Sequence, residues 1–121
     1  VKIISVNCSD RHTTYFFNTE AAAYVYENKI PLELCPTSNM QCGLCNSIAE
    51  HPFKKLYDDG FNVTINTDNR LMSNTTMSQE IFNLVECFSF TKEEIQNITI
   101  NTIKSGFLDV DKRNKLLERL K

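Results

Sequence analysis

Two short polar clusters hold the side chains of this chain that are best suited to chemistry, and each follows a stretch with the pattern of a β-strand. Ser38 and Asn39 follow the first stretch, and Asp68 and Asn69 follow the second. If the strands are parallel, all four side chains emerge at one edge of the sheet, where α/β folds bind ligands and metals. Short polar side chains also favour turns and helix caps, so this second interpretation of Asp68-Asn69 stays open.

The strands that would position these clusters each come directly after a helix. An Ala-rich helix over residues 20–28 precedes a strand over 31–35, and a helix that His51-Pro52 opens and Gly60 ends precedes a strand over 61–67. Pro at the start of a helix and Gly at its end are typical boundary signals. Two helix-to-strand units with short connections predict parallel strands joined by right-handed crossovers, which is an α/β architecture.

The second strand alternates between polar and β-branched side chains. Neighbouring residues of a strand point to opposite faces of a sheet. One face therefore receives Asn62, Thr64, Asn66 and Asp68, and the other receives Val63, Ile65 and Thr67. We expect the polar face to line a site, such as the lumen and mouth of a barrel, although an edge strand can show the same alternation.

The sequence after the second strand predicts three helices. Residues 77–88 carry an apolar stripe, Thr91 and Glu94 form a capping box before a helix that reaches residue 104, and residues 109–120 form a last helix. Residues 1–6 have the pattern of a further strand, whereas residues 7–19 show no clear period.

Composition sets the broad class of the protein. A chain of 121 residues is long enough for one domain or for one piece of a larger domain. The net charge of -2 predicts no nucleic-acid partner. The sequence has no apolar run of roughly 20 residues, so no membrane span is predicted. The sequence at the N-terminus does not have the order of a signal peptide, so a cytoplasmic location is expected.

The chain has five cysteines, an odd number without the density of a disulfide scaffold, which predicts reduced thiols. Cys42 and Cys45 form a C-x-x-C sequence. A structural zinc site would need a second pair of ligands, and the sequence offers none. Incidental thiols are favoured over a redox role.

Several motifs in register resemble the closing third of adenosine deaminase in its bacterial-type form. They are Leu-Glu-Leu-Cys-Pro-Thr-Ser-Asn at 32–39, His51-Pro52, Asn-Thr-Asp-Asn-Arg-Leu-Met-Ser at 66–73, and Phe107-Leu108. The resemblance covers roughly residues 20–120. It implies a zinc-dependent (β/α)8 barrel that hydrolyses the 6-amino group of adenosine and deoxyadenosine, of which residues 20–121 form the C-terminal part. That part would hold the last two or three parallel strands and the C-terminal helices, after a segment of atypical sequence at 1–19 that includes one candidate strand.

The same resemblance implies roles for individual residues. Asp68 matches the zinc ligand at the end of the last barrel strand, and Asn69 matches a residue that faces the purine, where many members have a second aspartate. Ser38 and Asn39 match residues that we expect to support the zinc-bound aspartate and to shape the site. His12 lies one residue short of the position of a catalytic histidine but lacks the flanking glycines, so it is either a degraded equivalent or a coincidence.

The family's remaining active-site motifs are absent from these 121 residues. They are a His-x-His pair and a His-Ala-Gly-Glu segment, which precede the matched region in the family. We therefore expect the isolated chain to have negligible zinc affinity and no deaminase activity. The alternatives are a non-catalytic α/β interaction module, a half-barrel that needs a partner chain or self-associates, and another purine aminohydrolase of the same superfamily.

Overall fold

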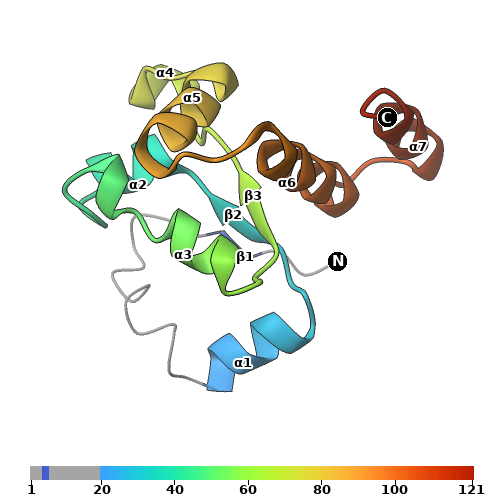
Figure 1. Ribbon diagram of the computed structural model, residues 1–121, viewed down its shortest axis with the longest axis horizontal. Coiled ribbons are helices and arrows are strands. Elements are labelled where there is room, and N and C mark those ends of the chain that lie inside the picture. The colour runs from blue at the N-terminus through green and yellow to red at the C-terminus, as the bar shows by residue number, and fades with distance from the viewer. Residues whose placement is uncertain (1–3, 6–19) are drawn as a thin grey trace.

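A three-stranded parallel sheet lies at the centre of the chain (Figure 1). The computed structural model describes residues 4–5 and 20–121. The strand order is β1-β2-β3, with β1 at Ile4–Ser5, β2 at Leu32–Leu34 and β3 at Val63–Ile65. Both pairings are parallel. The predicted parallel α/β arrangement is therefore confirmed, with strands shorter than their sequence patterns, and His12 lies outside the described residues.

The helices follow the predicted order, with additional short ones between them. They are α1 (Glu20–Glu27), α2 (Pro36–Gln41), the 3-10 helix η2 (Ile48–Glu50), α3 (Phe53–Asp58), α4 (Arg70–Ser73), α5 (Met77–Phe88), α6 (Lys92–Ser105) and α7 (Val110–Glu118). The predicted capping box begins α6, where Thr91 Oγ1 accepts a hydrogen bond from the Glu94 amide and the Glu94 carboxylate accepts one from the Thr91 amide. None of the helices in the described ranges is long and apolar enough to cross a membrane.

The register of β2 and β3 separates the sheet into an apolar and a polar face. Leu32 pairs with Val63 and Leu34 with Ile65, and all four side chains are buried in the core. Helices α3, α5 and α6 pack against β3 and contribute Phe53, Leu56, Leu84 and Ile98 to this core. The polar face carries Glu33 opposite Thr64. The alternation predicted from the sequence is thus confirmed for residues 63–65, the extent of β3.

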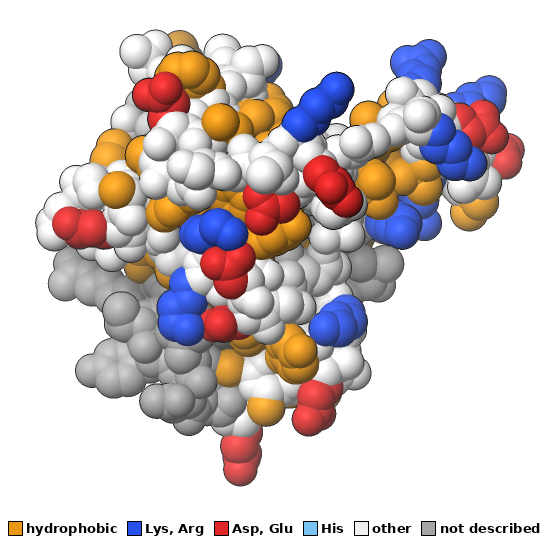
Figure 2. Space-filling view, viewed as in Figure 1, with side chains coloured by type: hydrophobic (Ala, Val, Ile, Leu, Met, Phe, Trp, Pro, Cys, Tyr) orange, Lys and Arg blue, Asp and Glu red, His pale blue; other side chains and the backbone are white. Residues whose placement is uncertain are grey.

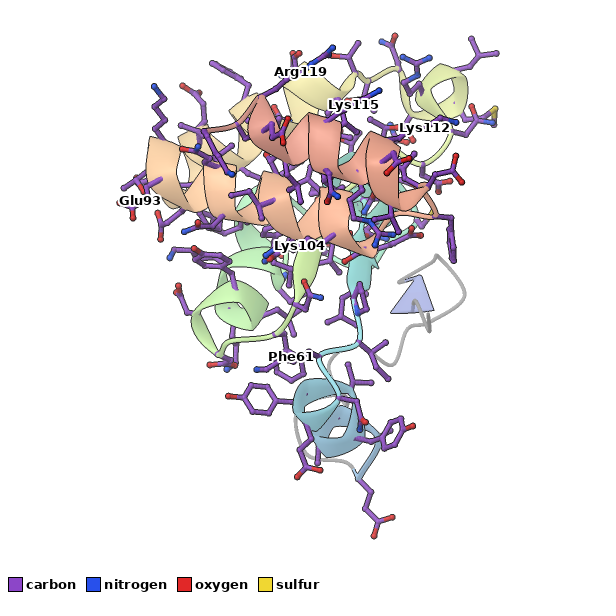
Figure 3. The ribbon with its side chains drawn as sticks, turned by 90° about the vertical axis from the view of Figure 1, so that its right-hand side faces the viewer. Phe61, Glu93, Lys104, Lys112, Lys115 and Arg119 are labelled. Atoms are coloured by element: carbon purple, nitrogen blue, oxygen red, sulfur yellow. The ribbon has the colours of Figure 1, made fainter. Side chains whose placement is uncertain are left out.

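Helix α7 packs on α6 and reaches away from the sheet (Figure 1). Arg113 joins the two helices because its guanidinium donates to the carbonyl oxygens of Gly106 and Leu108 in the connecting turn. Basic side chains gather on α7 in the space-filling view (Figure 2). Figure 3 shows Lys112, Lys115 and Arg119 along the exposed side of this helix, as expected for a solvated face.

Gly60 ends α3 with a φ of +85°, in the left-handed region that side chains disfavour. We expect Gly60→Ala to lower the free energy of unfolding by about 1–2 kcal/mol, because a Cβ makes this conformation costly. The added Cβ would meet Tyr26 at 3.5 Å, an ordinary contact, so steric overlap adds little. Urea unfolding measures the effect. Gly106→Ala is the matched control, since Gly106 has a φ of −66° and should tolerate the change; equal losses in both variants would contradict the backbone explanation.

Candidate functional site

Ser38 and Asp68 meet at the C-terminal edge of the sheet. Ser38 lies in α2, directly after β2, and Asp68 lies in the turn between β3 and α4. The Ser38 hydroxyl donates a hydrogen bond of 2.9 Å to Asp68 Oδ2, across 30 residues of sequence. The predicted proximity of these two side chains is therefore observed, and it follows from the parallel pairing of β2 and β3.

Asp68 occupies an uncommon backbone conformation, with a φ of +54°. Aspartate tolerates the left-handed region better than most residues do, because its short side chain can bond locally. Ser38 holds one carboxylate oxygen, and the other, Oδ1, accepts no hydrogen bond from the described part of the chain. The carboxylate is thus oriented by one oxygen and open at the other.

Asn69 is the N-cap of α4. Its side-chain oxygen accepts hydrogen bonds from the amides of Leu71 and Met72, each at 3.1 Å. The helix-cap interpretation is therefore correct for Asn69, and the cap also explains why a four-residue helix begins directly after Asp68. Its amide nitrogen takes no part in the cap.

Asn39 is buried and bonds away from Asp68. Its Oδ1 accepts hydrogen bonds from the Cys35 amide and from His51 Nε2, both at 3.1 Å. The other ring nitrogen of His51, Nδ1, accepts from the Phe53 amide at 3.1 Å. This pattern requires a neutral ring with its proton on Nε2, and burial lowers the pKa of His51 to about 4.

The position of His51 just before a helix, which the sequence pattern predicts, is confirmed, and the network adds a role for its side chain. The side chain is buried, 3% exposed, and links α2 to the segment before α3 through Asn39. The two residues are 12 positions apart, so no local pattern could pair them.

Cys35 lies at the end of β2, close to Asp68. Burial, followed by the charges of Asp68, Glu33 and Glu80, raises the pKa of the Cys35 thiol to about 12. The side chain therefore stays a neutral thiol at physiological pH.

The described residues supply one candidate ligand for a metal rather than a complete site. Within residues 4–5 and 20–121, no group of three or more His, Cys, Asp or Glu side chains could hold a metal ion. A catalytic zinc site takes three protein ligands and keeps one open position. Asp68 suits one of these places, because Ser38 holds its Oδ2 while Oδ1 accepts no hydrogen bond from the described residues.

A small pocket of about 130 Å³ adjoins the polar face of the sheet. Glu33, Thr64 and Asn66 line it from the strands, and the end of α6 with Phe107 lines it from the other side. The side-chain amide nitrogen of Asn66 donates to the hydroxyl of Thr64 at 2.8 Å, which orders this wall of the pocket. The polar side chains thus border a cavity, as the alternation in the sequence predicts.

The prediction of reduced thiols is wrong at Cys42, which is disulfide-bonded. Cys35, Cys45 and Cys87 are free. The number and density of cysteines do not show whether two particular side chains approach within bonding distance, which explains the error. Cys42 and Cys45 do not bond each other, and burial together with the charge of Glu50 raises the pKa of Cys45. The absence of a redox role for this sequence stays a prediction.

Comparisons with known proteins give one consistent family. The family model described as adenosine deaminase matches residues 14–121, a range that excludes His12. Adenosine deaminases of Mycobacterium ulcerans and Mycobacterium marinum are each 52% identical to this chain over 99 residues. These alignments cover 82% of this chain and 27% of each relative. The chain therefore spans about a quarter of the length of the curated relatives it matches.

Solved structures share the fold at lower sequence identity. An adenine deaminase from Arthrobacter aurescens has a TM-score of 0.87 and 22% identity, over 99% of this chain and 35% of its own. The N6-mAMP deaminase of Arabidopsis has a TM-score of 0.82 and 24% identity, over 98% of this chain and 33% of its own. An amidohydrolase solved with bound Zn has a TM-score of 0.69 and 24% identity, over 88% of this chain and 30% of its own. The fold agrees with these structures, and with the matched family model the conclusion is direct: this chain belongs to the adenosine deaminase family.

Proposed function

We propose that this chain supplies the closing strands and one zinc ligand, Asp68, of a (β/α)8 barrel that deaminates adenosine and deoxyadenosine. The observation that carries the proposal is the hydrogen bond from Ser38 to Asp68 at the C-terminal edge of the parallel strands. Active sites of such barrels lie at that edge. In this assignment residues 20–121 form the C-terminal part of the barrel and residues 1–19 form an atypical segment.

The arrangement of Asp68 suits a zinc ligand. Ser38 fixes one oxygen, which orients the carboxylate, and the open oxygen points to a place that the rest of the site would complete. A bound zinc ion supplies the Lewis acidity that activates water for hydrolysis of a C–N bond. The remaining ligands would come from the part of the barrel that precedes the matched quarter, so the chain alone is expected to hold no zinc.

Asn69 and the polar face of the sheet would serve the substrate. Because the cap of α4 uses only the side-chain oxygen of Asn69, its amide nitrogen can donate to a ring nitrogen of a purine. Thr64 and Asn66 would line the lumen below. Asn39 would support the site indirectly, through the start of α2 rather than through Asp68.

Adenosine is favoured over other purine substrates by the comparisons. The relatives at 52% identity are adenosine deaminases, whereas the structures named for adenine and N6-mAMP deaminases are only 22–24% identical. A different purine aminohydrolase is the second candidate, and a substrate panel would separate the two.

A chimera tests the proposal. Residues 20–121 of this chain replace the matching part of a full-length relative, and the conversion of adenosine to inosine is followed by ultraviolet absorbance. We expect the chimera to deaminate adenosine and to contain zinc by elemental analysis, and we expect Asp68→Ala to lose both properties.

Asp111→Ala is the matched control, because Asp111 is exposed on α7, away from the strand ends. This variant should keep its activity and metal. A chimera that retains zinc and full activity after loss of the Asp68 carboxylate would refute the assignment of Asp68.

A further inference from the structure

A carboxylate is buried in the core next to the candidate site. Glu80 lies in the first turn of α5 and is 0% exposed. It stands one helical turn before Leu84, another fully buried residue, so it occupies a position where an apolar side chain would ordinarily lie. Burial of a carboxylate is costly unless donors surround it. The placement of Glu80 therefore calls for a specific explanation.

Both oxygens of Glu80 accept hydrogen bonds. Oε2 accepts from the Thr37 amide at 3.0 Å, and Oε1 accepts from the Thr75 hydroxyl at 2.6 Å. Thr37 lies in the first turn of α2 and is followed directly by Ser38. Glu80 thus joins α5 to the start of α2 across 43 residues of sequence.

Helix α2 has only six residues, so its direction depends on contacts with other elements. Gln41 at its end donates to the Ser73 carbonyl of α4, and Asn39 is bonded to His51. Glu80 is the contact that fixes the backbone amide adjacent to Ser38. A rotation of this first turn would move the Ser38 hydroxyl away from Asp68 Oδ2.

We propose that Glu80 is a positioning residue, which fixes the first turn of α2 so that Ser38 donates its hydrogen bond to Asp68. The effect of this role on metal binding rests on the proposed function. The effect of Glu80 on the hydrogen bond between Ser38 and Asp68 does not depend on that function. The coupling can therefore be tested without metal or substrate.

The test follows the side-chain carboxyl carbon of Asp68 by NMR in the isotope-labelled full chain. Ser38→Ala, which removes the hydrogen bond, defines a reference shift of this signal. We expect Glu80→Met, which has similar size but no acceptor, to shift it in the same direction by at least half of that amount. We expect Glu80→Gln to restore the wild-type signal, because its amide oxygen can accept from Thr37 while its NH₂ group donates to the Thr75 hydroxyl.

Two comparisons separate positioning from general stabilisation. Glu86→Met changes an exposed residue of the same helix and should leave the Asp68 signal unchanged. In the Ser38→Ala background, Glu80→Met should add no further shift. If Glu80→Met lowers stability with an unchanged Asp68 signal, or shifts it equally without Ser38, the proposal is overturned.

Thr75→Val serves if Glu80→Met does not fold, since it removes only the hydroxyl that donates to Oε1. The proposal is supported if Thr75→Val shifts the Asp68 signal when Ser38 is present and adds no shift in the Ser38→Ala background. An unchanged Asp68 signal overturns the proposal. A chimera without deaminase activity would refute the proposed function and leave these NMR results standing.

Discussion

Lowering the pH from 6.5 to 4 is expected to destabilise the chain by about 3 kcal/mol through His51 alone. The ordinary pKa of 6.5 describes the unfolded chain, and burial lowers the folded value to about 4. Between these values the unfolded state binds more protons than the folded state, so unfolding becomes easier as the pH falls. The contribution of the neutral ring is fully present above pH 6.5 and is lost when the pH reaches about 4.

The structure gives a direct reason for the lowered pKa. The Phe53 amide donates to Nδ1, so a proton at this nitrogen would oppose an existing donor in a buried place. Urea unfolding at a series of pH values measures the effect. His51→Gln cannot titrate in this range, and subtraction of its pH profile from that of the wild type removes the contribution of all other groups. Parallel profiles for the two proteins would show that His51 does not titrate as a buried ring.

Local signals explain which parts of the fold could be predicted. The capping box of Thr91 and Glu94 and the apolar stripe of α5 are contained in a few neighbouring residues, and both helices lie where these signals place them. Helix α4 has only four residues and depends on the Asn69 cap, so a periodic pattern could not reveal it. The strands are shorter than predicted because pairing, rather than alternation, sets their length.

The site was predictable only where it follows from the strand ends. Parallel strands bring Ser38 and Asp68 to one edge whatever the details of packing, and the two do meet. The hydrogen bonds between Asn39 and His51 and between Thr37 and Glu80 join residues that are 12 and 43 positions apart, so they depend on the tertiary fold. Composition likewise could not predict the disulfide of Cys42, because a disulfide forms only where the fold brings two cysteine side chains close together.

The core behind the site gives the largest expected loss of stability. Phe53 is 0% exposed, and its ring meets that of Phe90 edge-on, with centroids 5.8 Å apart. We expect Phe53→Ala to lower the free energy of unfolding by about 3–5 kcal/mol, the range for truncation of a buried phenylalanine. Domains have only about 5–15 kcal/mol in total, so much of this variant should be unfolded in mild denaturant.

Phe82→Ala is the matched control, because Phe82 lies on α5 and is 55% exposed. It should change stability by within about 0.5 kcal/mol, as exposed substitutions do. Urea midpoints compare the two variants, and an unchanged m-value shows that the same surface unfolds. The Phe53 ring lies beside the His51 ring, with centroids 6.3 Å apart, so its removal should expose His51 to water and flatten the dependence of stability on pH between 4 and 6.5. Equal stability of the Phe53 and Phe82 variants would mean that the apolar face of the sheet does not organise the core, and the positions of Ser38 and Asp68 would then need another explanation.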